Sequence, residues 1–284
     1  MRSLRRGGLN NRTEVRFYQA ALNLFNDANL VVDGSYGRKT ESGTCDFQRS
    51  RGLPVTGKAD KETLNALGFR TTHNPGIVLW EIPFERIEEA HVLAKDRQKY
   101  SVTRFAKEGG YDIVWNGAFF RGSTRAIGTF IMIDGEVKHW GMGYKGIAYD
   151  SPFTRAEGDL YGAYIHKPYD IQGGAPVLID KYRRDEKSIY DFKARSAEQK
   201  ANYNSRKRRN CTGHTKNSLI LMFSIVNLTM DDMIKEGLLQ RDIAFLQNND
   251  GGGSQSLAVE GSLVISTDGR FIPAAVGLKL KLRR

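Results

Sequence analysis

The sequence predicts an α+β protein, with a small three-helix domain at residues 3–69 and a larger mixed α/β domain, rich in β-hairpins, at residues 77–284. In the first part, apolar residues recur at the three- and four-residue spacing of helices. After residue 76, short runs of β-branched and aromatic residues are bounded by Gly, Asp and Asn, as in strands joined by tight turns. The segment 70–76, RTTHNPG, is predicted to link the two domains.

The N-terminal domain is predicted to consist of three helices that share one core. One side of each helix carries small or apolar residues: Val15, Tyr18, Leu22 and Phe25, then Thr40, Gly43, Thr44 and Phe47, then Leu64 and Leu67. Asp33-Gly34 forms a turn after the first helix, because both residues tolerate a left-handed backbone. Asp60 is placed to cap the start of the third helix.

The larger domain is predicted to mix strands and helices without strict alternation. The predicted strands lie within seven runs: 76–84, 111–120, 129–141, 174–182, 217–226, 241–250 and 256–266. Asp134-Gly135 and Glu260-Gly261 are typical of tight hairpin turns. Helices are predicted at 87–98 and at 229–239, the second starting at a Thr229 N-cap. The charged segment 180–210 is predicted to be a solvated helix and loop, with a mobile lid or a basic rim for a polyanion as the alternative.

Composition restricts the classes of partner. The 284 residues carry a net charge of +11, which favours an anionic partner: nucleic acid, an acidic membrane or an anionic cell-wall polymer. No apolar run is long enough to span a membrane. The N-terminus has a basic start without an apolar segment behind it, so it does not read as a secretory signal. Cys45 and Cys211 are expected to be free thiols.

Four polar or glycine-bearing turns are predicted to adjoin strands of the larger domain. They hold Asn116 and Gly117; Gly173 and Gly174; Arg209, Thr212 and His214 around Gly213; and Asp250, Gly251, Gly252, Gly253 and Ser254. Because loops at strand ends commonly build a site on a sheet, we expect these turns to meet in one cleft. Taken alone, the glycine run has two interpretations: backbone that approaches a ligand, or a flexible tip.

The first seventy residues resemble the three-helix peptidoglycan-binding domain appended to wall hydrolases. The matching residues, in order, are Val15, Gln19, Leu22, Asp33, Gly34, Gly37, Thr40, Phe47, Gln48, Gly52, Leu53, Gly57 and Leu64. Gly43 and Thr44 depart from the family, which usually has small or apolar helix formers there. The resemblance implies that this domain binds peptidoglycan.

The larger domain resembles the phosphodiester glycosidase family. The family's signature loops correspond to Asn116–Phe120, Gly173–Pro176, Arg209–Gly213 and Asp250–Ser254. Ala118 replaces a glycine of the family, and Asn210 stands where the family usually has Thr, so a hydroxyl contact there passes to Thr212 or is lost. The resemblance implies hydrolysis of the bond between a sugar's anomeric carbon and a phosphodiester.

That chemistry suggests a role for each residue type. Arg209 would grip phosphate with its planar fork, and Asp250 would steady the oxocarbenium-like transition state or aim water. The triple glycine would present backbone donors, and Asn116 would hold a sugar hydroxyl or acetamido group. His214 is either an acid/base or a structural histidine. Asp250, together with residues 249 and 260, would help to hold Ca²⁺ or Mg²⁺ if a metal is used, although no recognised ligand spacing is present.

The two resemblances together predict a wall-targeted hydrolase that cleaves sugar-1-phosphate bonds in teichoic acid or in its linkage to peptidoglycan. The expected partners are peptidoglycan and an anionic wall polymer, and the expected location is the cell wall, reached by export or by lysis as for a phage endolysin. The alternative is a non-catalytic wall- or virion-associated binding protein. A nucleic-acid phosphodiesterase is disfavoured, because helix-turn-helix, RNP-like and zinc signatures are absent from the sequence.

Overall fold

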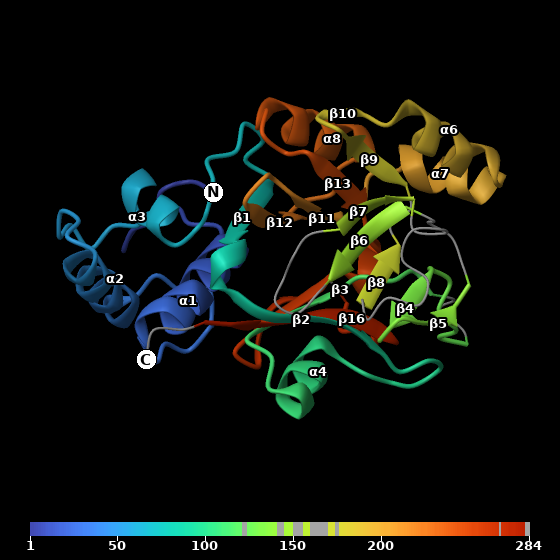
Figure 1. The fold of residues 1–284 in the computed structure, drawn as a ribbon. Helices are drawn as coiled ribbons and strands as arrows, with labels where there is room; N and C mark the ends of the chain where they lie inside the picture. Colours follow the sequence, from blue (N-terminus) through green and yellow to red (C-terminus); the bar gives the residue numbers. More distant parts are fainter. Residues whose placement is uncertain are drawn as a thin grey trace.

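The protein has an α+β fold, as predicted. The computed structural model describes residues 1–120, 124–140, 145–149, 156–159, 170–173, 176–266 and 268–281. These residues form seven α-helices and three antiparallel sheets (Figure 1). Among them, none of the helices has the length and apolar character needed to cross a membrane. Cys45 and Cys211 are both free, as predicted.

The N-terminal helices are α1 (Arg12–Asn26), α2 (Arg38–Ser50) and α3 (Lys61–Ala66). The Asn11 side chain caps α1, since it accepts hydrogen bonds from the backbone N–H groups of residues 13 and 14. Asp60 caps α3 by accepting from the N–H of Thr63, as the sequence predicts.

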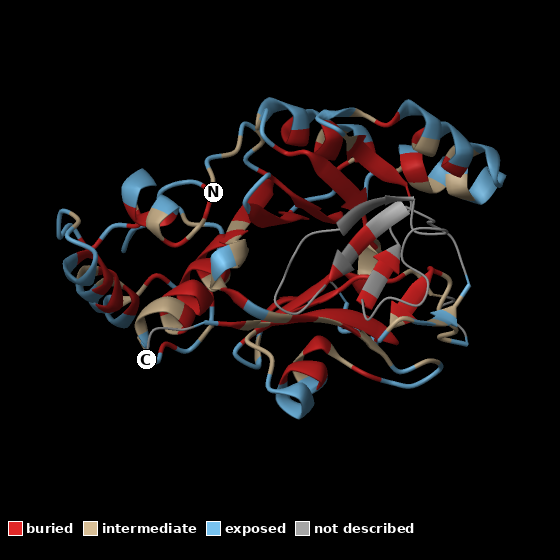
Figure 2. Ribbon diagram, viewed as in Figure 1, coloured by how far each residue is buried: buried red, intermediate tan, exposed pale blue. Residues whose placement is uncertain are grey.

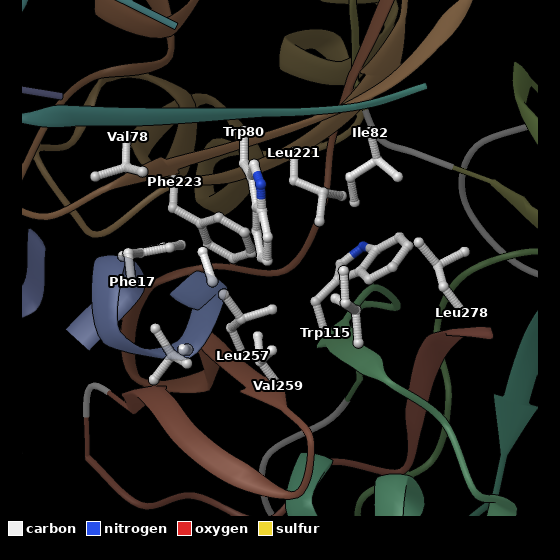
Figure 3. Close-up of a cluster of buried hydrophobic side chains, with 14 of the residues drawn as sticks. Phe17, Val78, Trp80, Ile82, Trp115, Leu221, Phe223, Leu257, Val259 and Leu278 are labelled. Atoms are coloured by element: carbon white, nitrogen blue, oxygen red, sulfur yellow. The ribbon is translucent and has the colours of Figure 1, made fainter. Parts of the chain in front are cut away.

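Two sheets pack face to face and enclose the core. The first has the order β1 (Ile77–Pro83), β12 (Ser218–Ser224), β11 (Asn210–His214), β13 (Phe245–Asn248), β9 (Val177–Asp180) and β10 (Arg183–Arg184). The second has the order β15 (Ser262–Ser266), β14 (Ser256–Val259), β3 (Ile113–Asn116), β16 (Ala274–Leu280) and β2 (Ile87–Ala94). Trp80, Leu221 and Phe223 project from the first sheet toward Trp115 and Leu257 of the second (Figure 3).

Helices cover the outer faces of both sheets. On the first sheet lie α6 (Glu186–Ala194), α7 (Ala197–Asn204) and α8 (Met230–Leu239), and on the second lies α4 (Val102–Gly109). Because both of its faces are covered, every residue of β12 is buried. The predicted Thr229 cap of α8 is confirmed as a capping box with Asp232. Segment 180–210 contains α6 and α7, and most of its residues are exposed, as expected of solvated helices.

A third sheet lies at the end of the molecule opposite α1–α3 (Figure 1). Its order is β5 (Glu136–His139), β4 (Ile131–Ile133), β8 (Asp170–Gly173), β6 (Lys145–Tyr149) and β7 (Ala156–Asp159). The predicted turns at Asp134-Gly135 and Glu260-Gly261 join β4 to β5 and β14 to β15. All four residues have φ between 47° and 78°, which is the left-handed backbone of tight hairpin turns.

The prediction of a helix at residues 87–98 is wrong, because residues 87–94 form strand β2. The run IEEAHVLA places apolar residues at both helical and alternating positions, so its period alone does not decide between the two structures. Pairing decides it: β2 aligns along its length with β16, which also pairs with β3 on its other side. Sheet pairing here overrides the local preference of Glu and Ala for helix.

The N-terminal helices and the two sheets share one hydrophobic core. Phe17 of α1 is fully buried, with its ring centroid 5.9 Å from that of Phe223 on β12 (Figure 3). The ring centroids of Phe25 and Trp80 are 6.3 Å apart. The sequence predicts one apolar stripe on α1, whereas the structure buries a second face that includes Phe17 and Leu24. The two predicted domains are therefore packed together as one body.

Segment 70–76 connects the two predicted domains and is fixed in place at both ends. Arg70 pairs with Glu81 at 2.7 Å and donates twice to the carboxylate of Asp242, at 2.7 and 2.9 Å. The carboxylate of Glu236, which is 1% exposed, accepts from the backbone N–H groups of His73 and residue 74. These contacts hold the segment against α8 and β1.

Candidate functional site

The glycine-rich run 249–255 carries the chain from one packed sheet to the other. It leaves β13 in the first sheet and enters β14 in the second. On the way, the N–H of Asn249 donates to the carbonyl of Asn210 at 2.8 Å, and the N–H of Asp250 donates to the carbonyl of Gly117 at 3.1 Å. Three of the four predicted loops therefore meet where β3 and β13 end and β11 begins, at one edge of the two sheets.

Close packing requires glycine at 251 and backbone conformation favours it at 252, whereas at 253 only the ends of exposed side chains would have to move. A Cβ added to Gly251 would lie 2.4 Å from the carbonyl oxygen of Arg208, and one added to Gly253 would lie 2.0 Å from a carboxylate oxygen of Asp268. Gly252 has φ +60°, a left-handed conformation that side chains rarely adopt. The N–H of Gly252 donates to the carbonyl of Arg208 at 2.8 Å. The glycines thus allow the crossing itself, and contact between their backbone and a substrate stays a prediction.

A cavity of about 290 Å³ opens beside this crossing. Its lining residues are Phe119, Asn202, Lys207, Arg209, Asn248, Asn249, Asp250, Gly251, Gly252, Gly253 and Arg270. Among these residues, Asp250 supplies the only carboxylate, and it faces cations from two separate segments of the chain. Ser254, the last residue of the predicted loop, is buried beside Asp250.

Asp250 is poised to change its charge near neutral pH. Burial raises the pKa of its carboxyl to about 7. A hydrogen bond from the side chain of Ser254, together with the positive charges of Arg270 and Lys207, lowers the pKa in part but does not offset burial. A carboxyl with a pKa near the working pH is suited to transferring protons.

Arg209 lies on the same cavity as Asp250, but most of its donors face the protein. Its side chain is buried, and Nη2 donates to the carbonyls of Asn202 at 2.7 Å and of Ser205 at 2.6 Å. Nε donates to the carbonyl of Leu228 at 3.2 Å, and Nη1 reaches Oδ1 of Asn202 at 3.4 Å. Burial lowers the pKa of the guanidinium. In this conformation the guanidinium of Arg209 is hydrogen-bonded to the C-terminal end of α7, so most of its N–H groups are not available to a ligand in the cavity.

Two cations outside the predicted set of site residues are better placed to meet an anion, and one of them, Lys207, belongs to the segment with a predicted basic rim. Lys207 is exposed at the cavity wall, and Arg270 is partly exposed and pairs with Asp268 at 2.9 Å. A signal for Lys207 was present: it lies two residues before Arg209, on the same side of an extended segment. Arg270 lies far from these residues in sequence and only sheet packing brings it near, so no local pattern marks it.

Asn116 and Thr212 support the site from within the protein. Nδ2 of Asn116 donates to the carbonyl of Asp250 at 2.7 Å, and its Oδ1 accepts from the N–H of Ser256 at 2.8 Å. Oγ1 of Thr212 accepts from Nε1 of Trp115 at 3.0 Å and from Nδ2 of Asn249 at 2.6 Å. Both side chains are buried and neither lines the cavity. Their geometry is that of residues that position the Asp250 loop, and the predicted contact with sugar finds no support in it.

The segment predicted as a turn around Gly213 is a buried strand, β11, and His214 lies at its far end. In the register of β11 against β13, His214 pairs with Phe245, whereas Cys211 pairs with Asn248 beside the cavity. The ring of His214 stacks on that of Phe245, and its Nδ1 lies 2.8 Å from the carbonyl oxygen of Thr215. His214 does not line the cavity, so this arrangement favours the structural interpretation of the histidine.

The second predicted loop reaches the site through its strand. Gly173 ends β8, and the neighbouring Gln172 donates to Oδ1 of Asn249 at 3.2 Å. A Cβ on Gly117 would lie 2.3 Å from the side-chain oxygen of Gln172, so Gly117 is needed for this close approach. Gly174 lies outside the described residues.

The predicted cation ligands come together only in part, since Asn249 and Asp250 line the cavity and Glu260 does not. Glu260 lies at the end of β14 remote from the cavity, where its N–H donates to the carbonyl of Asp112. Nδ2 of Asn249 donates to Thr212. In the part of the chain that the structure describes, there is no group of three or more His, Cys, Asp or Glu that could hold a metal ion.

Comparison with known proteins supports the two resemblances predicted for the N-terminal and the larger part of the chain. Residues 11–67 match the family model of a peptidoglycan binding domain. The catalytic domain of zebrafish N-acetylglucosamine-1-phosphodiester alpha-N-acetylglucosaminidase, auto-inhibited by its pro-peptide, matches with TM-score 0.59 and 18% identity over 75% of this chain and 86% of that chain. A hypothetical protein from Synechocystis matches with TM-score 0.55 and 12% identity over 75% of this chain and 61% of that chain. No curated protein matches the chain.

Residues 11–67 therefore match the peptidoglycan binding domain family, and the larger part of the chain shares the fold of the zebrafish enzyme's catalytic domain. Both predicted resemblances are thereby confirmed, at the level of the family for the first and of the fold for the second.

Proposed function

We propose that the protein is a cell-wall hydrolase that cleaves sugar-1-phosphate bonds in an anionic wall polymer, such as teichoic acid or its linkage to peptidoglycan. One observation carries the proposal: the carboxyl of Asp250 shares a cavity with Lys207, Arg209 and Arg270, and burial raises the pKa of this carboxyl. The solved enzyme with this fold is named for a phosphodiester of N-acetylglucosamine, which supports the same bond type here.

In the proposed reaction, ionised Asp250 aims a water molecule at the anomeric carbon and accepts its proton. The oxygen of water bonds to that carbon while the carbon–oxygen bond to phosphate breaks, and the electron pair leaves with the phosphomonoester. Because phosphate is a weak base, its departure needs little protonation, which agrees with one carboxyl among the residues described at this cavity instead of the usual pair.

Lys207 and Arg270 are proposed to hold the phosphate. Both are exposed to the cavity, and their charges act on Asp250 from outside the Asp250 loop. Phosphate would make charge-assisted hydrogen bonds with them, which are stronger than bonds between neutral groups. Phe119 offers the one aromatic face among the described cavity residues, on which a sugar ring would pack.

The peptidoglycan-binding domain and the net charge of +11 support a wall polymer as the substrate. Because the two parts share a core, the bound wall would be presented to the cavity in one orientation. A more specific proposal is that the protein is a phage endolysin-type enzyme. This role requires that it act on the intact walls of a susceptible cell.

The test is incubation of purified Gram-positive walls with the protein. We expect equal molar amounts of new reducing sugar and new phosphomonoester, and complete loss of both with Asp250→Asn. Asp46→Asn, at an exposed surface aspartate, is the matched control and is expected to retain activity. If walls bind but release neither product, the protein is the non-catalytic wall-binding protein of the alternative hypothesis. Product release by Asp250→Asn at the rate of the unmodified protein would contradict the assigned role of Asp250.

A further inference from the structure

Helix α7, at the edge of the cavity, is weakly attached to the rest of the protein. Tyr203 is its one buried residue. Figure 2 shows α6 and α7 largely exposed, in contrast to the buried strands beside them. An eight-residue helix is not stable by itself in water, so the few contacts of α7 determine whether it stays in place.

Tyr203 makes the first attachment. Its hydroxyl donates to Oδ1 of Asp231 at 2.7 Å and accepts from Nη2 of Arg184 at 3.2 Å. Nζ of Lys193 on α6 lies 3.8 Å from the centroid of the ring. This attachment fixes one side of α7 to the start of α8.

Arg209 makes the second attachment, at the C-terminal end of α7. Its Nη2 donates to the carbonyls of Asn202 and Ser205, which lie in and just after the last turn. The last carbonyls of a helix have no partner within the helix, and a cation is favourable there. Asn202 itself lines the cavity, so Arg209 holds a wall of the cavity in place.

The charge of Arg209 is buried, and none of the residues that the structure describes gives it an anionic partner. Its guanidinium donates only to neutral oxygen atoms, those of Asn202, Ser205 and Leu228, and among the described residues no carboxylate lies within ion-pairing distance of it. Burying an unneutralised charge is costly. Hydrogen bonds from a guanidinium to phosphate are stronger than those to carbonyl oxygens, so a phosphate that reaches this side chain would compete well with α7.

We propose that α7 is a gate to the cavity, that Arg209 holds the gate closed, and that a phosphate-bearing ligand releases it by taking the guanidinium from the carbonyls of Asn202 and Ser205. The inference rests on the proposed function only in requiring that the cavity accept a phosphate group. Arg209 then has two sets of acceptors, the end of α7 and the phosphate, and exchange between them couples ligand entry to movement of the cavity wall.

Hydrogen–deuterium exchange of the backbone amides in residues 197–204, followed by mass spectrometry, tests the gate without any turnover. Arg209→Lys keeps the charge but replaces the Nε and Nη2 donors, which bond Leu228, Asn202 and Ser205 from two separate nitrogens, by a single ammonium nitrogen. We expect exchange of this segment to quicken by roughly tenfold or more, the effect of losing charge-assisted bonds, with little change in β12 and β13. Arg183→Lys, at an exposed arginine on β10, is the matched control and should leave the segment unchanged.

Inorganic phosphate is the probe for the second arm, on the unmodified protein. Rising phosphate should quicken exchange in 197–204, and Tyr203→Phe, which loses only the hydroxyl, should lower the phosphate concentration needed. Exchange in 197–204 that is unchanged in Arg209→Lys, or that is unchanged or slower in phosphate, would overturn the gate. If both arms give the expected result but walls release no product, the gate stands and the proposed reaction fails.

Discussion

Replacing Asp250 by Asn removes a titrating carboxyl from the cavity and leaves a side chain of nearly the same shape. Burial raises the pKa of this carboxyl from its ordinary value near 4 to about 7. A carboxyl whose pKa is higher in the folded state binds its proton more tightly when folded. Its contribution to stability is therefore fully present below pH about 4 and is lost as the pH rises through about 7.

The size of the effect follows from the two pKa values. Between pH 5 and pH 8, titration of Asp250 lowers the free energy of unfolding of the unmodified protein by up to about 2.5 kcal/mol. The Asn variant lacks this titrating group and does not show this loss. In a chain of this length, 1 kcal/mol corresponds to about 2 °C in Tm. We therefore expect the Tm of Asp250→Asn, measured relative to that of the unmodified protein, to rise by about 5 °C over this pH range.

Differential scanning calorimetry or denaturant unfolding at a series of pH values measures this difference. Asp46→Asn is the control, because the side chain of Asp46 is 59% exposed, and its Tm should follow that of the unmodified protein at every pH. If the curves of Asp250→Asn and the unmodified protein run parallel from pH 5 to pH 8, Asp250 is not a buried carboxyl with a raised pKa, and the reasoning fails.

The remaining predictions test catalysis, packing and ligand binding. We expect kcat/KM on purified walls to rise as the pH rises to about 7, because ionised Asp250 acts; activity that falls or stays constant between pH 5 and pH 7 would contradict a base role. Gly251→Ala should destabilise the protein by about 1–3 kcal/mol in denaturant unfolding, because its Cβ would overlap a neighbouring carbonyl oxygen. Phe17→Ala should cost about 3–5 kcal/mol within a single unfolding transition, with exposed Leu9→Ala as the control; two separate transitions would refute the shared core. Lys207→Met should raise KM about tenfold with little change in Tm, as expected for loss of a charge-assisted bond to phosphate.

Local sequence patterns predicted the helix caps and the tight turns, because these features depend on interactions between residues that are close in sequence. The caps at Asp60 and Thr229 and the turn at Asp134-Gly135 depend on a few neighbouring residues, and all three are confirmed. Strand β2 was missed because its structure comes from pairing with β16, far along the chain. The second buried face of α1 was missed for the same reason, since Phe17 meets its partner Phe223 only after folding.

The sequence predicted which loops come together but not the partners of each side chain. The motif loops do converge, and Asp250 lies on a cavity with Arg209. Whether a polar side chain faces a ligand or its own backbone depends on atoms that a motif does not specify. Asn116, for example, directs its amide to the carbonyl of Asp250, and Arg209 directs its guanidinium to the end of α7.

In the proposed reaction, water attacks the anomeric carbon, and the bond from this carbon to the phosphate oxygen breaks. Hydrolysis of purified walls in ¹⁸O-labelled water, followed by ³¹P NMR of the released phosphomonoester, tests it directly. Our account predicts that the phosphomonoester carries no ¹⁸O, because the new oxygen enters the sugar. Phosphate that carries ¹⁸O from the solvent would mean attack at phosphorus, and would contradict a glycosidase.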